Sequence, residues 1–225
     1  MFLATGALDD ASARCAFAAA MGSANNPTHT YTFSNQNIGT PSPTRVLVLI
    51  VYAQNANLSA SGYIDSLTVG GQAATPVFLD QVGSITQSIW VLPFPGGTIG
   101  NQADVVATRN TGNGFAYVYI AMFAAYFLNS STPIDVQTGA TLALTLTLDT
   151  ITDAGGFLIA SSLIAGGFPT AYAGATSVCD ITVGVAGVQQ LSAAIKAPTV
   201  ASAAYPTTTT TTNPNGTNQF TASFR

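Results

Sequence analysis

The chain has 225 residues, of which 6% are charged, whereas about 25% are charged in an ordinary globular protein. Its five basic residues are too few to neutralise a row of phosphates, so the composition excludes a nucleic-acid-binding protein. A hydrophobic content of 48% supplies material for a core. The absence of Glu and the presence of one lysine, Lys196, remove good helix formers and favour an all-β protein.

The first 24 residues are rich in Ala and differ from the rest of the chain. Asp9 or Asp10 is placed to cap a short helix that runs to Met21. An extended arm that becomes ordered against a neighbouring subunit explains the same composition. We therefore predict an N-terminal arm or short helix over residues 1–24 and a single β-sandwich domain over residues 25–225. We expect neither a signal peptide nor a membrane span.

From Thr28 onward, apolar and polar residues alternate with a period of two, which indicates β-strands. Residues 45–53 are apolar on both faces and belong in the middle of a sheet, whereas Gly70 and Gly71 suit a hairpin turn. Residues 141–148 place Leu on one face and Thr on most of the other. The expected strands cover residues 28–33, 45–53, 63–69, 72–79, 85–92, 103–108, 115–127, 141–148, 157–164, 177–183, 188–196 and 219–224.

Short strands separated by Gly, Pro and Asn turns predict an antiparallel, jelly-roll-like β-sandwich. Residues 198–216 contain six consecutive threonines and no apolar alternation, so we expect a Thr-rich loop before the closing strand. Alternatively, residues 198–216 form a segment that lies along a neighbouring subunit.

Catalytic chemistry is hard to find in this sequence. The single histidine, His29, lies in an alternating segment away from any nucleophile motif, and we interpret it as a strand residue. Asp149 and Asp153 bracket a turn; they are candidates for a carboxylate dyad or for calcium ligands, but turn capping is their ordinary role.

No metal site, cofactor site or disulfide is predicted. Other oxygen ligands are scattered along the chain: Asn55, Asn57, Asp65 and Asp80. Cys15 and Cys179 lie far apart in sequence, match no zinc spacing, and are expected to be reduced, buried thiols.

The aromatic residues also favour packing over binding. Trp90 alternates with Ile89 and Val91, and Tyr117 and Tyr119 lie in the most apolar strand, so we interpret all three aromatic side chains as core.

Few charges suit faces that neighbouring subunits cover, because interface cores are depleted in Lys, Glu and Asp. Short Thr, Ser, Asn and Ala side chains also lose little rotamer entropy when they pack. If the surface is covered, at least one of Arg45, Arg109 and Arg225 should pair with an Asp.

Three stretches carry a resemblance to a known family. TPSPTRVLVLIVYAQN, with Arg45, is followed by IDSLTVGGQAATPV, with residues 66–75, and by SIWVLPFPGGTIG, with residues 89–97. This succession resembles a β-sandwich module of tailed-bacteriophage virion proteins over roughly residues 28–130, with weaker similarity in the closing NQFTASF. The resemblance implies a structural or adhesive part of a phage particle, such as a head decoration, fibre or tail-tip module, and it identifies no catalytic residue.

Together these observations predict a non-enzymatic virion structural protein made in the host cytoplasm, such as a capsid decoration or cement protein. Its expected partners are further copies of itself and other virion proteins such as the major capsid protein, with no nucleic acid and no membrane. One alternative is a receptor- or glycan-binding module of a tail fibre or tail tip, which needs exposed aromatic side chains in loops. A second alternative is a cell-wall hydrolase that uses Asp149 and Asp153.

Overall fold

The computed structural model describes residues 14–55, 63–82, 85–94, 100–109, 115–165, 170–183, 189–211 and 217–225. Every regular element in these ranges is a β-strand, and none of the described residues forms a helix that could cross a membrane. Asp9, Asp10, Asn57 and residues 212–216, which figured in the predictions, lie outside the described ranges.

The strands form four antiparallel sheets, numbered here in the order in which they stack. Sheet 1 contains, in spatial order, β2 (Thr30–Asn37), β8 (Gln102–Thr108), β4 (Ser66–Val69) and β5 (Gln72–Ala73). Sheet 2 contains β1 (Arg14–Thr28), β9 (Phe115–Tyr126), β3 (Val46–Asn55), β7 (Ile85–Pro93) and β6 (Thr75–Val82). Sheet 3 contains β10 (Asp135–Thr141), β17 (Thr217–Phe224), β12 (Phe157–Ala165), β15 (Gln189–Lys196) and β14 (Thr176–Val183). Sheet 4 contains β11 (Thr145–Thr152), β16 (Ser202–Thr211) and β13 (Thr170–Ala173).

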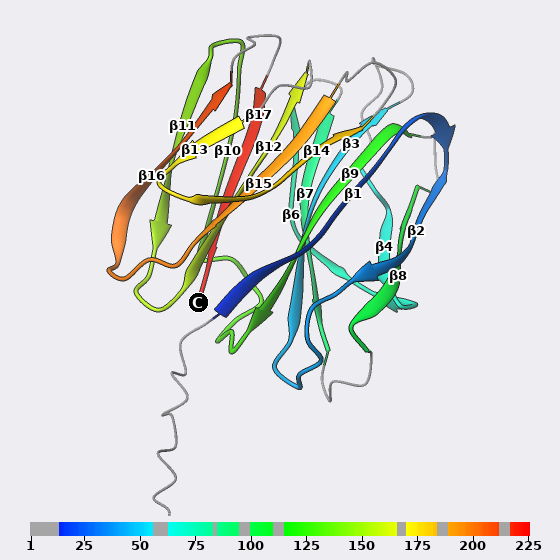
Figure 1. Ribbon diagram of the computed structural model, residues 1–225, viewed down its shortest axis with the longest axis horizontal. Helices are drawn as coiled ribbons and strands as arrows, with labels where there is room; N and C mark the ends of the chain where they lie inside the picture. Colours follow the sequence, from blue (N-terminus) through cyan, green and yellow to red (C-terminus); the bar gives the residue numbers. More distant parts are fainter. Residues whose placement is uncertain are drawn as a thin grey trace, which may run out of the picture.

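Figure 1 shows the four sheets nearly edge-on, with sheet 4 at the left and sheet 1 at the right. Side chains from the two faces of sheet 2 enter different cores: Leu49 packs toward sheet 1, and Ile50 packs toward sheet 3. Because successive strand residues point to opposite faces, a strand between two cores must be apolar on both. The expected all-β antiparallel sandwich is confirmed, with more layers than the two of a jelly roll.

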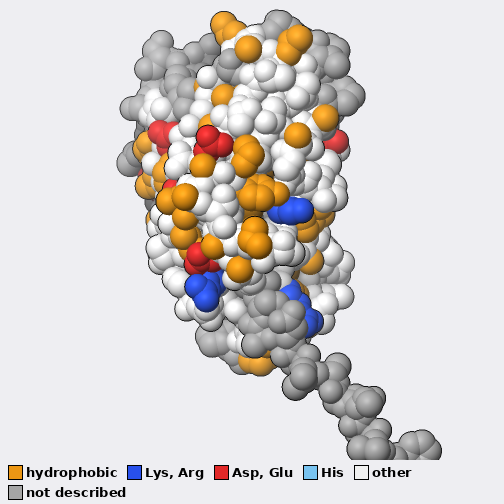
Figure 2. Space-filling model, turned by 90° about the vertical axis from the view of Figure 1, so that its left-hand side faces the viewer, with side chains coloured by type: hydrophobic (Ala, Val, Ile, Leu, Met, Phe, Trp, Pro, Cys, Tyr) orange, Lys and Arg blue, Asp and Glu red, His pale blue; other side chains and the backbone are white. Residues whose placement is uncertain are grey.

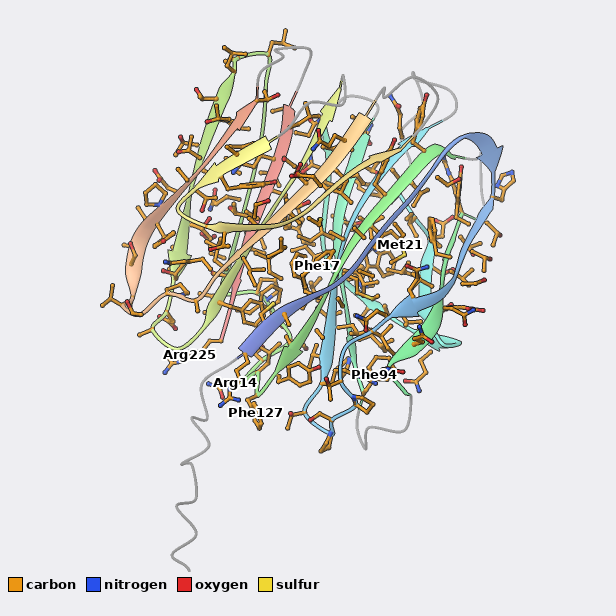
Figure 3. The ribbon with its side chains drawn as sticks, in the orientation of Figure 1. Arg14, Phe17, Met21, Phe94, Phe127 and Arg225 are labelled. Atoms are coloured by element: carbon orange, nitrogen blue, oxygen red, sulfur yellow. The ribbon has the colours of Figure 1, made fainter. Side chains whose placement is uncertain are left out.

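Residues 14–24 belong to β1, an edge strand of sheet 2, and the helix expected to end at Met21 does not form in the described part. A helix would place Phe17 and Met21 on one face. Instead, a bulge at Ala18 turns them to opposite faces, so that Phe17 meets Phe123 edge-on and Met21 enters the core between sheets 1 and 2 (Figure 3). One strand thereby contributes to two cores, which the helix could not do.

The strand expected over residues 141–148 is wrong in its first half and confirmed in its second, which begins β11. Residues 142–144 form a bend that carries the chain from β10 in sheet 3 to β11 in sheet 4, and Leu142 is 74% exposed. Alternation resumes after the bend, where Leu146 and Leu148 pack over Gly139 of β10. By contrast, the expected hairpin at Gly70 and Gly71 is confirmed, with positive φ at both glycines.

The Thr-rich loop expected over residues 198–216 is also wrong, because residues 202–211 form β16 at the centre of sheet 4. Thr207, Thr209 and Thr211 point inward and are buried, while Thr210 points outward. A run of identical residues conceals this alternation, and the β-branched threonine suits a strand.

The space between sheets 3 and 4 holds many buried polar side chains. Thr150 of β11 and Thr221 of β17 place their hydroxyl oxygens 2.6 Å apart, whereas the buried Thr209 hydroxyl has no hydrogen-bond partner among the described residues. Replacing Thr209 with Val removes an unsatisfied group at nearly constant volume, so we expect the free energy of unfolding to rise by about 1 kcal/mol.

The matched variant Thr150→Val leaves the Thr221 hydroxyl without its partner and should lower the free energy of unfolding by about 1 kcal/mol. Urea denaturation of both variants measures the two changes. A loss of stability in Thr209→Val would show that its hydroxyl is hydrogen-bonded in solution.

Candidate functional site

His29 lies between β1 and β2, and its contacts are structural. Its imidazole Nδ1 lies 3.1 Å from the main-chain oxygen of Arg109 and donates to it, while the Arg109 amide donates to the His29 carbonyl over 2.8 Å. This reciprocal pair joins the start of β2 to the end of β8.

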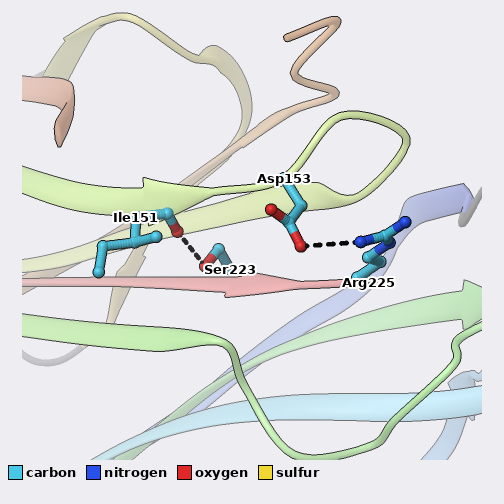
Figure 4. Close-up of polar contacts among 4 residues, drawn as sticks. All are labelled: Ile151, Asp153, Ser223 and Arg225. Atoms are coloured by element: carbon cyan, nitrogen blue, oxygen red, sulfur yellow. Dashed lines mark hydrogen bonds and ion pairs between the residues drawn. The ribbon is translucent and has the colours of Figure 1, made fainter. Parts of the chain in front are cut away.

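The two aspartates considered as a dyad have different surroundings. Asp149 is exposed on β11 opposite Pro206, whereas Asp153 follows β11 and pairs with Arg225 at 3.2 Å (Figure 4). The expected pairing of an arginine with an aspartate is therefore confirmed at Arg225. Both partners are well exposed, and such a pair contributes no more than about 1 kcal/mol.

The aromatic predictions are confirmed as core packing. Trp90 is buried between sheets 1 and 2, and its indole N–H donates to Ser88 Oγ over 2.9 Å. Tyr119 is fully buried and stacks against the half-buried Tyr117, with ring centroids 6.4 Å apart.

The remaining candidate ligands are not brought together: within the described ranges, no three His, Cys or Asp side chains are grouped as a metal site requires. Asp80 accepts a hydrogen bond from the Thr138 hydroxyl, the Asp65 amide donates to Thr108, and Asn55 ends β3. Both cysteines are free and half-buried. Burial raises the pKa of Cys15 and raises that of Cys179 to about 12, so both thiols stay protonated at neutral pH.

The outer face of sheet 4 is nearly uncharged. Cross-strand partners point to the same face, and the pairs Thr147–Thr208 and Thr145–Thr210 make a short hydroxyl array, with the Thr147 and Thr208 oxygens 2.7 Å apart. The described outward side chains include Thr145, Thr147, Asp149, Ile151, Pro206, Thr208, Thr210, Ala171 and Ala173, and among these only Asp149 carries a charged type of side chain. Figure 2, which views this side of the molecule, shows mainly white and orange atoms with scattered charges.

A cavity of about 610 Å³ opens at the start of β1 and the end of β9, beside the segments that follow β2 and precede β8. The cross-strand neighbours Ala16 and Ala124 leave room in it because their side chains are small. Polar groups come from Arg14 on β1 and from two further segments, with Asn37 at the end of β2 and Asn101 before β8. Sequence reasoning missed this site because its residues come from distant parts of the chain.

Arg45 holds the loops beside this cavity. Its side chain is fully buried, and Nη1 donates to the carbonyls of Gly39 and Gly100 at 3.0 Å each and to that of Ile38 at 3.4 Å. The guanidinium lies 4.8 Å from the ring centroid of Phe94. Burial lowers the pKa of Arg45, but a guanidinium remains charged in proteins.

Phe127 at the cavity has an unusual backbone. Its φ is +59°, in the left-handed region that costs a non-glycine residue about 1 kcal/mol or more, and its side chain is 41% exposed. Figure 3 shows Phe127 and Arg14 at the same end of the molecule. An exposed, strained aromatic residue beside a cavity marks this end as a candidate binding site.

Comparisons of the chain with protein families, with curated proteins and with solved structures gave no match.

Proposed function

We propose that the chain is a non-enzymatic structural protein of a tailed-phage particle, such as a capsid decoration or cement protein. It acts by packing against further copies of itself and against other virion proteins. The supporting observation is the outer face of sheet 4, on which Thr, Ala and Ile side chains surround one ionisable group, Asp149.

Such a face is suited to burial. Its short side chains have little rotamer entropy to lose, and few ions need to be desolvated. The bend between β10 and β11 adds two exposed leucines, Leu142 and Leu144, at the end of the same sheet. Apolar area of this kind contributes about 25 cal/mol per Å² when it is covered.

The test is whether particles contain the protein. Phage particles induced from the strain that carries the gene should contain the chain in many copies, as quantified by mass spectrometry against the other particle proteins. Gold-labelled antibodies should decorate the particle surface or a repeated site on it. Absence of the chain from purified particles contradicts the proposal.

A further inference from the structure

We propose that the cavity at the start of β1 and the end of β9 binds a saccharide unit that carries a carboxylate, such as a uronic acid. This inference goes beyond the proposed structural role, because a subunit that acts only by packing needs no ligand site. It rests on the cavity, on the single cation among its described lining residues, on its neutral hydrogen-bonding groups and on the exposed ring of Phe127.

The size and lining of the cavity suit a small hydroxylated ring. Its volume of about 610 Å³ falls within the range of about 300–1,000 Å³ usual for ligand sites. Ala16 and Ala124 leave space next to the sheet, and a side chain at Gly39 would collide with Ala124, because an added Cβ would lie 2.5 Å from the Ala124 Cβ. The loop at Gly39 therefore lies close against β9 and forms one side of the cavity.

The polar groups of the cavity are preorganised. Tyr126 donates its hydroxyl hydrogen to the Thr40 carbonyl over 3.0 Å, and the Asn37 side-chain oxygen accepts a hydrogen bond from the Gly39 amide over 2.9 Å. The second contact fixes the Asn37 amide and leaves its NH₂ group to donate to a ligand hydroxyl. Arg45 holds the carbonyls of Gly39 and Gly100, so the loops that carry Asn37 and Asn101 keep their positions.

The charge of the cavity lining favours a sugar that carries a negative charge. Arg14 is the one cationic side chain among the lining residues that the structure describes, and a guanidinium binds a carboxylate through two parallel hydrogen bonds. A nucleotide or polyphosphate would need several cations, whereas the described part of the lining offers one. The ring of Phe127 offers an apolar face to the C–H groups of a sugar ring, and the backbone strain at this residue is consistent with a binding role.

The experiment is a titration of the full chain with sodium glucuronate, followed by NMR chemical shifts, with glucose plus sodium chloride at matched ionic strength as the neutral probe. We expect glucuronate to bind with a Kd on the order of 1 mM, with shifts confined to the cavity residues, and glucose to bind about tenfold more weakly. Tetragalacturonate distinguishes the source: tighter binding than the monosaccharide indicates a polymer chain, and equal binding indicates a free sugar.

Two variants and one matched control locate the site. Arg14→Gln should weaken glucuronate binding about tenfold, because it removes the charge-assisted pair. Phe127→Gly should weaken it about fivefold while keeping the fold, because glycine adopts a positive φ without strain. Arg225→Gln removes an exposed cation outside the cavity lining and should leave binding unchanged.

Three results would overturn the inference. The first is no binding of either uronate, and the second is an equal loss in Arg225→Gln and Arg14→Gln, which would indicate attraction by charge alone. The third is a set of glucuronate-induced chemical-shift changes that lie away from the cavity residues, which would place the binding elsewhere on the chain. None of these results depends on whether the chain is found in phage particles.

Discussion

Replacing Arg45 with methionine should lower the free energy of unfolding by about 3–5 kcal/mol. The methionine side chain has similar length but donates no hydrogen bond, so the carbonyls of Gly39 and Gly100 lose a charged donor inside the protein. The contact with the Phe94 ring loses its cation as well. Urea denaturation, with the slope compared between variants, gives the change.

Two controls separate this role from a general effect of charge. Arg225→Gln removes a cation from an exposed ion pair and should change stability by less than about 1 kcal/mol. Arg45→Lys keeps the charge but loses the planar fork, and its stability should lie between those of wild type and Arg45→Met. If Arg45→Met is as stable as Arg225→Gln, the loops beside the cavity are held by other contacts.

Truncation of Phe224 to alanine is the second substitution with a large expected effect, about 3–5 kcal/mol of lost stability. The Phe224 ring is fully buried between sheets 2 and 3 and stacks on Phe157, with centroids 5.2 Å apart and planes inclined by 21°. Its strand, β17, lies between β10 and β12, so the cavity left by the truncation opens inside sheet 3 rather than at an edge.

Phe224→Leu fills most of this space and should cost less than about 1.5 kcal/mol, measured by the same denaturation experiment. A loss below about 1 kcal/mol in Phe224→Ala contradicts the stacking of sheets 2 and 3 around a common core, because a buried ring in a packed interior cannot be removed at so small a cost.

Much of sheets 1 to 3 could be predicted from the sequence, because their strands carry a plain apolar signal. Residues 45–53 are apolar on both faces and form most of β3, the central strand of sheet 2. The fourth layer could not be predicted, because the side chains between sheets 3 and 4 include Gln190, Thr150 and Ser192, which are buried although they are polar. A pattern based on hydrophobicity assigns such faces to solvent.

The candidate binding site at the cavity could not be predicted from the sequence either. Phe127 is not a typical turn residue, and nothing in the neighbouring sequence indicates a positive φ where β9 ends. The sequence predicts an N-terminal arm or short helix around Arg14, and only the pairing of this residue with Tyr126 places it beside Asn37 and Asn101. Phe127 is an exposed aromatic residue of the kind that a glycan-binding module needs, but the sequence alone does not indicate that it is exposed.

The central claim of the proposed function is that the outer face of sheet 4 packs against another copy of the chain. The direct measurement is the mass in solution by light scattering coupled to gel filtration, for wild type and for two variants. Thr147→Lys combined with Thr210→Lys places charges on this face, and Thr32→Lys places one on the exposed side of β2 in sheet 1 as the matched control.

We expect wild type and Thr32→Lys to have the same mass, a multiple of the 22.9 kDa of one chain, and the double variant to have the mass of one chain. Lysine ammonium groups would have to be desolvated when the faces meet, which opposes association. A wild-type mass of 22.9 kDa at every concentration, or an unchanged assembly in the double variant, would contradict the claim.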